Sequence, residues 1–323
     1  MNKELSEKEL MQALESMLLI RNFEIRAESA YQQGHVGGFF HAYIGQEAIQ
    51  TAAVMALGKD NWWTTTYRCH ALALLLGATP NEIMAELYGK ATGNAKGRGG
   101  SMHLYTDRLL GGFGIVGGQI PIATGAAFSL KYQDKKDEIS IGFLGDGAVP
   151  QGAFHESLNL AALWDLPCLY VIENNIWGMG THYRRANSVE KLAESHAKAY
   201  GIEGHTIDGT DFLLCYKTFK ELGEKIKKNS RPILLEVVAE RFRGHSISDP
   251  GLYRSKEELK HAMEHDPIII LKEKLIHAGA LDEEAFKELN KKYREKAAAA
   301  MKYAEESPWP ELSVLGEDVY APD

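Results

Sequence analysis

Two short polar motifs follow apolar stretches of the sequence and carry side chains suited to bind a metal ion. Gly145-Asp146-Gly147 follows the run EISIGFL, and Asn174-Asn175 follows LPCLYVIE, with residues 148–173 between the motifs. A carboxylate paired with an amide oxygen is a hard-oxygen ligand set, which suits magnesium better than zinc. Glycines on both sides of Asp146 would let a diphosphate approach the backbone. The sequence therefore predicts a site for magnesium and a diphosphate at Asp146 and Asn175.

The elements that must position these motifs are predicted to be strands of one sheet. Apolar strands are expected at 138–146, 166–174 and 231–241, with a short one at 205–207, and helices at 153–163 and 212–227. Strands that are apolar on both faces and alternate with helices favour an α/β fold, a doubly wound parallel sheet covered by helices. The carboxyl ends of its neighbouring strands share one edge, where ligands bind. We expect Asp146 and Asn175 side by side at that edge, with Gly147 near the start of a helix whose dipole favours an anion.

Helices are also predicted at both ends of the chain. Ser6 and Glu9 form a capping box, and Thr79-Pro80 and Asp266-Pro267 are further helix starts. Two helices are expected after the loop at 243–255. We therefore predict one domain over residues 1–323, with helical extensions at 1–60 and 266–323.

The segment from Gly89 to Gly118 is unusually rich in glycine. It contains GNAKGRGGSMH and GGFGIVGG, and it is predicted to be a long loop. Long ordered loops are usually functional. We expect the part of it around Gly93–Gly114, like the loop at 243–255, to be mobile until a ligand binds.

Composition narrows the class of protein. The chain has 323 residues, 45% of them apolar and 25% charged, and a net charge of −8, which argues against nucleic acid as a partner. Three cysteines without a CxxC pair favour a reducing cytoplasm. The charged N-terminal stretch is not predicted to be a signal peptide, and no apolar run is long enough to span a membrane.

The two motifs together resemble the thiamine diphosphate-binding motif, in which GDG is followed at about this spacing by NN. Longer segments resemble, in sequence and order, the alpha subunits of pyruvate dehydrogenase. The resemblance extends from about Leu18 to the C-terminus, and the segments that carry it are YIGQEA, YRCHALAL, GNAKGRGGSMHL, GIVGGQIPIATG, GDGAVPQGAFHESLNLAALWDLP, ENNIWGMGT and RGHSISDPGLYR.

The resemblance implies roles for particular residues. Asp146 and Asn175 would ligate magnesium through their side chains, and Trp177 through its backbone carbonyl. The remaining cofactor contacts would come from backbone and side chains of Tyr67, Arg68, Gly114, Val116, Gly145, Gly147, Ala148, Arg185 and His245. In this set, Gly114 and Val116 would hold the pyrimidine ring, and Arg68 would neutralise phosphate charge.

Catalytic roles are implied for His70, His245 and Ser246, with His70 and Ser246 at the mouth of the site. Other interpretations compete at some positions: Tyr67 and His70 could be interior residues, and Arg185 an ordinary surface arginine. Ser246 and Ser248 lie where mitochondrial relatives carry a regulatory phosphorylation loop. A second regulatory serine of those relatives is replaced here by His182.

The implied activity is oxidative decarboxylation of pyruvate, with transfer of the acetyl group to a lipoyl arm. Enzymes of this class also need a glutamate from a pyrimidine-binding domain, and only one doubly wound pattern is visible here. The resemblance therefore implies a beta subunit in an α2β2 heterotetramer, and a lipoylated dihydrolipoyl acyltransferase core as the acceptor.

Three alternatives stay open from the sequence. The chain could be the alpha subunit of an acetoin or branched-chain 2-oxo acid dehydrogenase. It could be a non-catalytic subunit that binds magnesium and phosphate, although such a scaffold would not need Tyr67, Arg68 and His245. A nucleotide-binding Rossmann protein is the weakest alternative, because no GxGxxG follows a first strand.

Overall fold

The architecture is a parallel sheet enclosed by helices, seen in a computed structural model that describes residues 5–317, 319 and 320. The predicted domain and its two extensions therefore include residues 1–4, 318 and 321–323, which lie outside the described part. The sheet has six strands, all parallel, in the order β2 (Leu109–Phe113), β1 (Trp62–Thr66), β3 (Ser140–Gly145), β4 (Cys168–Asn174), β8 (Ile233–Val238) and β7 (Glu203–Asp208). The predicted α/β class and doubly wound sheet are confirmed.

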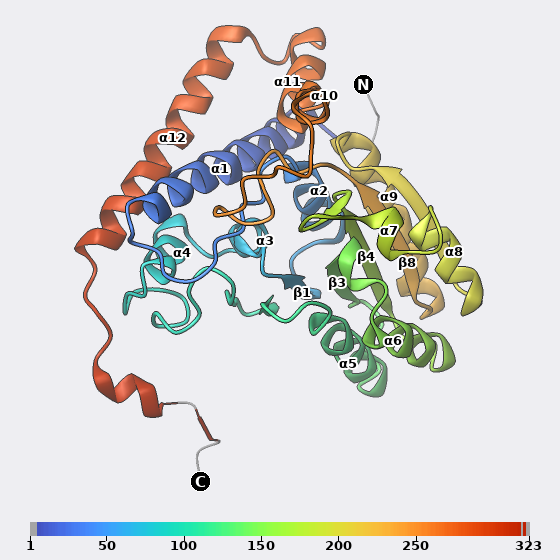
Figure 1. Cartoon of the computed structure of the whole chain (residues 1–323). Coiled ribbons are helices and arrows are strands. Elements are labelled where there is room, and N and C mark those ends of the chain that lie inside the picture. Colours follow the sequence, from blue (N-terminus) through green and yellow to red (C-terminus); the bar gives the residue numbers. More distant parts are fainter. Residues whose placement is uncertain (1–4, 318, 321–323) are drawn as a thin grey trace.

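Successive side chains of the central strands enter two separate cores. Phe143 and Val171 point into the core under α2 (Glu47–Leu57) and α9 (Phe212–Asn229). Their neighbours Leu144 and Ile172 point into the core under α5 (Gln119–Tyr132), α6 (Gly152–Leu163) and α8 (Leu192–Ala199). Both faces are thus covered, as Figure 1 shows, and this explains why these strands are apolar without alternation.

The helices at the two ends of the chain pack together beside the sheet. In Figure 1, α1 (Glu7–Gln32) lies against α12 (Glu283–Glu306), which also packs on α4 (Pro80–Leu87). The predicted caps are present, since Ser6 and Glu9 bond reciprocally and Asp266 accepts from the N–H of Ile268 in α11 (Pro267–His277). The segment after α12, including η2 (Leu312–Gly316), contacts the glycine-rich loop: the Pro308 carbonyl accepts from the N–H of Ala91, and Lys96 pairs with Glu317.

Two expectations about local structure were wrong. Strand β2 lies inside the segment expected to be all loop; it is a short edge strand that contains two glycines, so it lacks a strand-like pattern. In the described part of the chain three α-helices rather than two follow residue 255, because α10 (Lys256–Glu264) begins at a capping box of Ser255 and Glu258. Gly147 lies in the 3-10 turn η1 (Asp146–Ala148), and α6 begins at Gly152, close to the predicted helix start.

The remaining short elements connect the sheet to the candidate site. They are α3 (His70–Leu75), α7 (Tyr183–Ala186) and a hairpin of β5 (Trp177–Gly178) with β6 (Thr181–His182). Among the described helices, none combines the length and the apolar character that crossing a membrane would require.

Candidate active site

A cavity of about 710 Å³ lies at the carboxyl edge of the sheet, where β1, β3 and β4 end. The strand order predicts a ligand site at this place. From β1 the chain continues to β2 on one side of the sheet, and from β3 it continues to β4 on the other side, so the loops that follow β1 and β3 diverge and leave a crevice between them. Its lining contains most of the predicted site residues, namely Tyr67, Arg68, Gly114, Val116, Gly145, Asp146, Gly147, Ala148, Asn175, Trp177, His245 and Ser246.

The three predicted magnesium ligands converge on this cavity. Asp146 begins the turn after β3, and Asn175 follows β4, which pairs with β3 in register up to Gly145 opposite Glu173. Asn174 shapes the exit from β4, since its Oδ1 accepts from the N–H of Ile176 at 3.0 Å. Ile176 has φ +73°, a left-handed conformation that turns the chain so that Trp177 faces the cavity.

The chemistry of Asp146 fits a cation. The side chain is 2% exposed, and burial raises its pKa to about 6, against hydrogen bonds from the backbone and the charge of Arg241. A buried carboxylate whose charged form is disfavoured gains most from a metal ion. Within the described chain no three His, Cys, Asp or Glu side chains cluster as a metal site. A cation at Asp146 would therefore need further oxygen donors, and Asn175 and the Trp177 carbonyl line the same cavity.

Arg241 is the main site residue that sequence reasoning missed. This 2%-exposed arginine donates from Nε to Asn175 Oδ1 at 3.2 Å and from Nη2 to the Trp177 carbonyl at 2.8 Å. It therefore holds two of the three candidate ligand groups. Its position after β8, beside the RGHSISDP segment, was the only available signal, since an arginine at a strand end is usually exposed.

An aromatic cluster of two histidines and a tyrosine lies on one side of the cavity. The His41 ring is 4.3 Å from that of Tyr67 and 5.2 Å from that of His245, measured between ring centroids. Burial, with the charge of Arg68, lowers the pKa of His41 to about 2 and that of His245 to about 3. Both imidazoles are therefore neutral near pH 7. His41 was missed, although it directly precedes the YIGQEA segment.

Arg68 joins two loops at the cavity. Its guanidinium donates to the Ala42 carbonyl at 2.9 Å and to the His245 carbonyl at 2.6 Å. Burial, then the nearby Arg241, lower its pKa to about 10, so it still carries its charge at pH 7. Ser246 lies beside His245, and its Oγ is 3.1 Å from that of Ser248.

Two predicted positions were wrong. His70 does not lie at the mouth of the site: it is fully buried, with Nδ1 3.0 Å from Glu24 Oε2 and Nε2 2.8 Å from the Ser101 carbonyl. The helix that begins at His70 turns its first side chain inward, toward α1. Arg185 is exposed on α7 and does not line the cavity.

The glycines of the cavity differ in how closely neighbouring atoms approach them. A Cβ on Gly147 would lie 3.9 Å from the Cα of Gly178, and one on Gly114 would lie 3.0 Å from His103 Cε1. No neighbouring atom lies within 4 Å of the Cβ position of Gly145. The turn 145–147 therefore leaves room for a ligand that contacts main-chain N–H groups.

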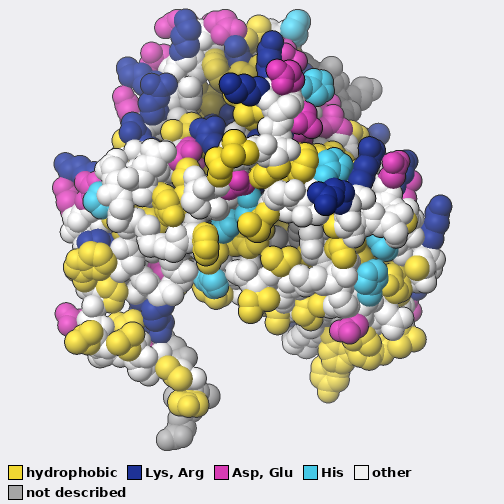
Figure 2. Space-filling view, viewed as in Figure 1, with side chains coloured by type: hydrophobic (Ala, Val, Ile, Leu, Met, Phe, Trp, Pro, Cys, Tyr) yellow, Lys and Arg dark blue, Asp and Glu magenta, His cyan; other side chains and the backbone are white. Residues whose placement is uncertain are grey.

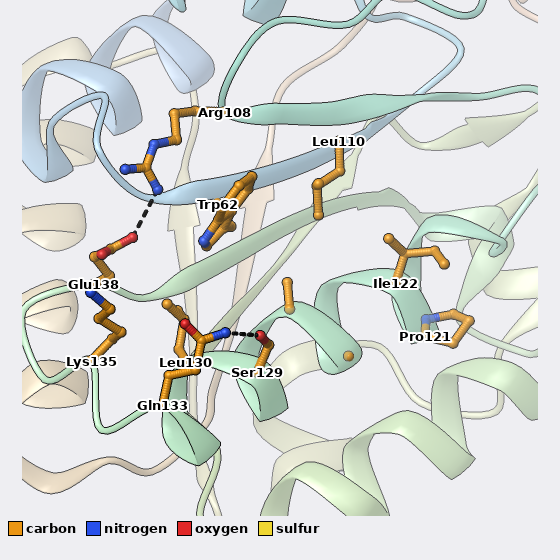
Figure 3. A pocket seen from close by; sticks show the side chains of 12 residues that line it. Trp62, Arg108, Leu110, Pro121, Ile122, Ser129, Leu130, Gln133, Lys135 and Glu138 are labelled. Carbon is orange, nitrogen blue, oxygen red and sulfur yellow. Dashed lines mark hydrogen bonds and ion pairs between the residues drawn. The ribbon is translucent and has the colours of Figure 1, made fainter. Parts of the chain in front are cut away.

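A second cavity, of about 570 Å³, lies at the opposite, amino end of the strands. Figure 3 shows Arg108 pointing to Glu138, with Trp62 nearby. The Arg108–Glu138 bond is 2.8 Å, and the guanidinium lies 4.8 Å from the Trp62 ring centroid. These charges neutralise each other, and none of the predicted site residues lines this cavity.

The fold and the first cavity define an α/β protein with a cavity at the carboxyl edge of a parallel sheet, lined by hard-oxygen donors and by a glycine-containing turn. A family profile described as "Dehydrogenase E1 component" matches residues 15–313. The chain belongs to this family of oxidoreductases, whose members in general depend on thiamine diphosphate.

Curated relatives match over nearly the whole chain. "Pyruvate dehydrogenase E1 component subunit alpha" of Rickettsia felis is 42% identical over 317 residues, which cover 98% of this chain and 97% of the relative. The protein of the same name from Rhizobium meliloti is 40% identical, covering 98% and 91%. "Pyruvate dehydrogenase E1 component subunit alpha-3, chloroplastic" of Oryza sativa is 39% identical, covering 97% and 76%.

Proposed function

We propose that this chain is the alpha subunit of a pyruvate dehydrogenase that decarboxylates pyruvate oxidatively and transfers the acetyl group to a lipoyl arm. The convergence of Asp146, Asn175 and Trp177 in one cavity with His245 is the observation that carries this proposal. The relatives named above favour pyruvate over acetoin or branched-chain 2-oxo acids. The whole chain would act as a single thiamine diphosphate domain with helical ends at 1–60 and 266–323.

The proposed cofactors are thiamine diphosphate and Mg²⁺. Asp146, Asn175 and the Trp177 carbonyl would hold the metal ion, because they supply oxygen donors to one cavity. Main-chain N–H groups of the turn 145–148 would bind the diphosphate, and Gly114 and Val116 would contact the pyrimidine ring. Arg241 would add positive charge behind Asn175 and Trp177, whereas the exposed Arg185 would need to move to reach the cavity.

Thiamine diphosphate, when bound, supplies the electron sink for loss of carbon dioxide. The protein's part is to orient the reactants and to handle protons. A pKa of about 3 makes His245 a weak base, and the negative charge of a diphosphate bound nearby would raise this pKa and let the imidazole accept or donate a proton at the cavity wall. Ser246 and Tyr67 would donate hydrogen bonds there. His70 is not proposed as a catalytic residue, because Glu24 and Ser101 enclose it.

The proposed partners are a beta subunit, in an α2β2 heterotetramer, and a lipoylated dihydrolipoyl acyltransferase core. Exposed apolar side chains support a large subunit interface. Ile115 and Val116 are 80% and 42% exposed at the cavity. Other exposed apolar side chains on or next to α5 and α6 are Phe128, Tyr132, Leu163 and Trp164. Figure 2 shows apolar side chains gathered over this part of the molecule. The three cysteines are free and buried, which supports the cytoplasm as the compartment.

Pyruvate-dependent reduction of an artificial electron acceptor tests the proposal, with magnesium and thiamine diphosphate present. The chain is assayed alone and after co-purification with its native partner, and activity is expected only with the partner. Faster turnover of 2-oxoisovalerate or acetoin than of pyruvate would overturn the substrate assignment. No turnover of any of the three, with cofactor bound, would favour a non-catalytic subunit.

A further inference from the structure

Glu86 is a buried carboxylate with an unusual set of partners. It lies in the last turn of α4, is 0% exposed, and points into the glycine-rich loop that follows. Its Oε2 accepts the N–H groups of Ala95 and Gly97 at 2.8 and 2.9 Å. Its Oε1 accepts those of Gly99 and Gly100 at 2.7 and 3.3 Å.

The carboxylate of Glu86 does not stabilise the helix that carries it. The carboxyl end of a helix carries partial negative charge, so an acidic side chain is disfavoured there. A buried carboxylate is also costly unless its oxygens are hydrogen-bonded. The four backbone N–H groups of the loop offset both of these unfavourable effects. Loops of this kind in other proteins enclose a bound anion in the same way.

Two glycines of this loop lie where a side chain would not fit, Gly93 because of Glu86 itself and Gly99 because of the His103 carbonyl. A Cβ on Gly93 would lie 2.2 Å from Glu86 Oε2 and 2.6 Å from the Glu86 Cα. A Cβ on Gly99 would lie 2.1 Å from the His103 carbonyl oxygen and 3.3 Å from Glu86 Oε1. Since real Cβ atoms do not approach so closely, the backbone can wrap around Glu86 only if these positions lack a side chain.

A second anchor fixes the end of the loop. The Ser101 carbonyl accepts from His70 Nε2 at 2.8 Å, and His70 Nδ1 pairs with the buried carboxylate of Glu24 on α1. The next two residues, Met102 and His103, line the cavity. His103 in turn lies against Gly114, on the segment proposed to contact the pyrimidine ring.

We propose that Glu86 is a positioning residue: its carboxylate takes the place of a bound anion inside the loop 93–101 and sets the backbone path that brings Met102 and His103 to the cavity wall. The loop is then shaped by the protein before any cofactor binds, which replaces the expectation from sequence that it stays mobile until then. The part that concerns cofactor affinity rests on the proposed function.

Hydrogen exchange on the wild-type chain without cofactor is the first test. The amides of Gly97, Gly99 and Gly100 should exchange at least about tenfold more slowly than unstructured amides, since each is bonded to a buried acceptor. Exchange at unprotected rates would overturn the proposal, and this measurement needs neither catalysis nor a variant.

Glu86→Gln is the matched variant, because it keeps the shape but replaces one acceptor by an N–H₂ group that faces loop donors. We expect amide exchange in residues 95–100 to rise about tenfold or more, as hydrogen bonds to a charged acceptor are lost. In the complex with the partner subunit, KM for thiamine diphosphate should rise about tenfold, with kcat changed less.

Glu305→Gln is the control, since Glu305 is exposed on α12, the helix packed on α4. It should alter neither exchange in residues 95–100 nor KM. Unchanged loop exchange in Glu86→Gln would overturn the positioning role. Faster amide exchange in residues 95–100 of Glu86→Gln, with an unchanged KM for thiamine diphosphate, would support the positioning role but would overturn its link to cofactor binding. Failure of wild-type turnover alone would count against the proposed function and not against the anchor.

Discussion

Arg241 and Trp177 are joined by a hydrogen bond of 2.8 Å between the guanidinium and the backbone carbonyl that is a candidate magnesium ligand. The same guanidinium bonds the side chain of Asn175. Arg241, which follows β8, thus holds two groups of the cavity that come from a distant segment after β4.

Replacing this arginine should impair cofactor binding. We expect Arg241→Met to weaken thiamine diphosphate binding about tenfold or more in the presence of magnesium, because charge-assisted hydrogen bonds contribute about 1.5–3 kcal/mol. Calorimetric titration of the complex measures this. Arg231→Met is the control, an arginine 44% exposed at the far end of the strand. Equal affinities for both variants would refute the role of Arg241.

Asp146 should make stability depend on pH when a chelator removes metal ions. Its pKa is about 6 in the folded chain, above the ordinary 3.8, so the folded state retains a proton that the unfolded state releases. The free energy of unfolding should therefore decrease as pH rises from about 4 to 6. At pH 7 the ionised, buried Asp146 should lower it by about 3 kcal/mol.

Asp146→Asn removes the ionisable group and with it this loss of stability. We expect the variant to be more stable than wild type at pH 7 in chelator, by an amount that disappears near pH 4, and to lose magnesium-dependent binding of thiamine diphosphate. Denaturant unfolding at the two pH values, with calorimetry for binding, measures both effects. Wild-type cofactor affinity in this variant would contradict the metal assignment.

His245→Ala should separate binding from group transfer. We expect thiamine diphosphate affinity to fall only a few-fold, whereas acetyl transfer to a lipoyl domain should fall about 10²-fold or more, as for loss of a general acid or base. His261→Ala is the control, because the His261 side chain is 71% exposed on α10. Equal losses of decarboxylation and transfer in His245→Ala would refute this role.

The buried pair of His70 and Glu24 should give a second pH dependence. Burial disfavours the charged imidazole, but the charge and hydrogen bond of Glu24, with the Ser101 carbonyl, outweigh it and raise the pKa of His70. The pair's contribution should be fully present below the unfolded pKa of about 6.5 and be lost as pH rises through the folded value.

His70→Gln tests this prediction. The difference in melting temperature between wild type and variant should be largest near pH 6 and should shrink as the pH is raised toward 9. Glu284→Gln, exposed on α12, should show no such trend. A difference that stays constant over this range would show that His70 is not charged in the folded chain.

The sequence alone determined the parallel α/β fold and the metal and diphosphate motifs. Apolar strands such as 166–174 have no polar face, so only a sheet covered on both sides can bury them. Asp146 and Asn175 each follow a strand end, and parallel strands bring such ends to one edge. These properties depend on local pattern and on general rules of sheet geometry.

The tertiary structure alone decided which side chains face the cavity and which are enclosed behind it. His70 adjoins Tyr67 and Arg68 in sequence, yet the turn into α3 directs it to Glu24, 46 residues away. His41 reaches the cavity from a distant segment, and Arg241 reaches Asn175 behind the cavity wall from another. Glu86 meets its loop only because α4 and the glycines are packed together. Such contacts depend on the packing of elements that no local pattern encodes.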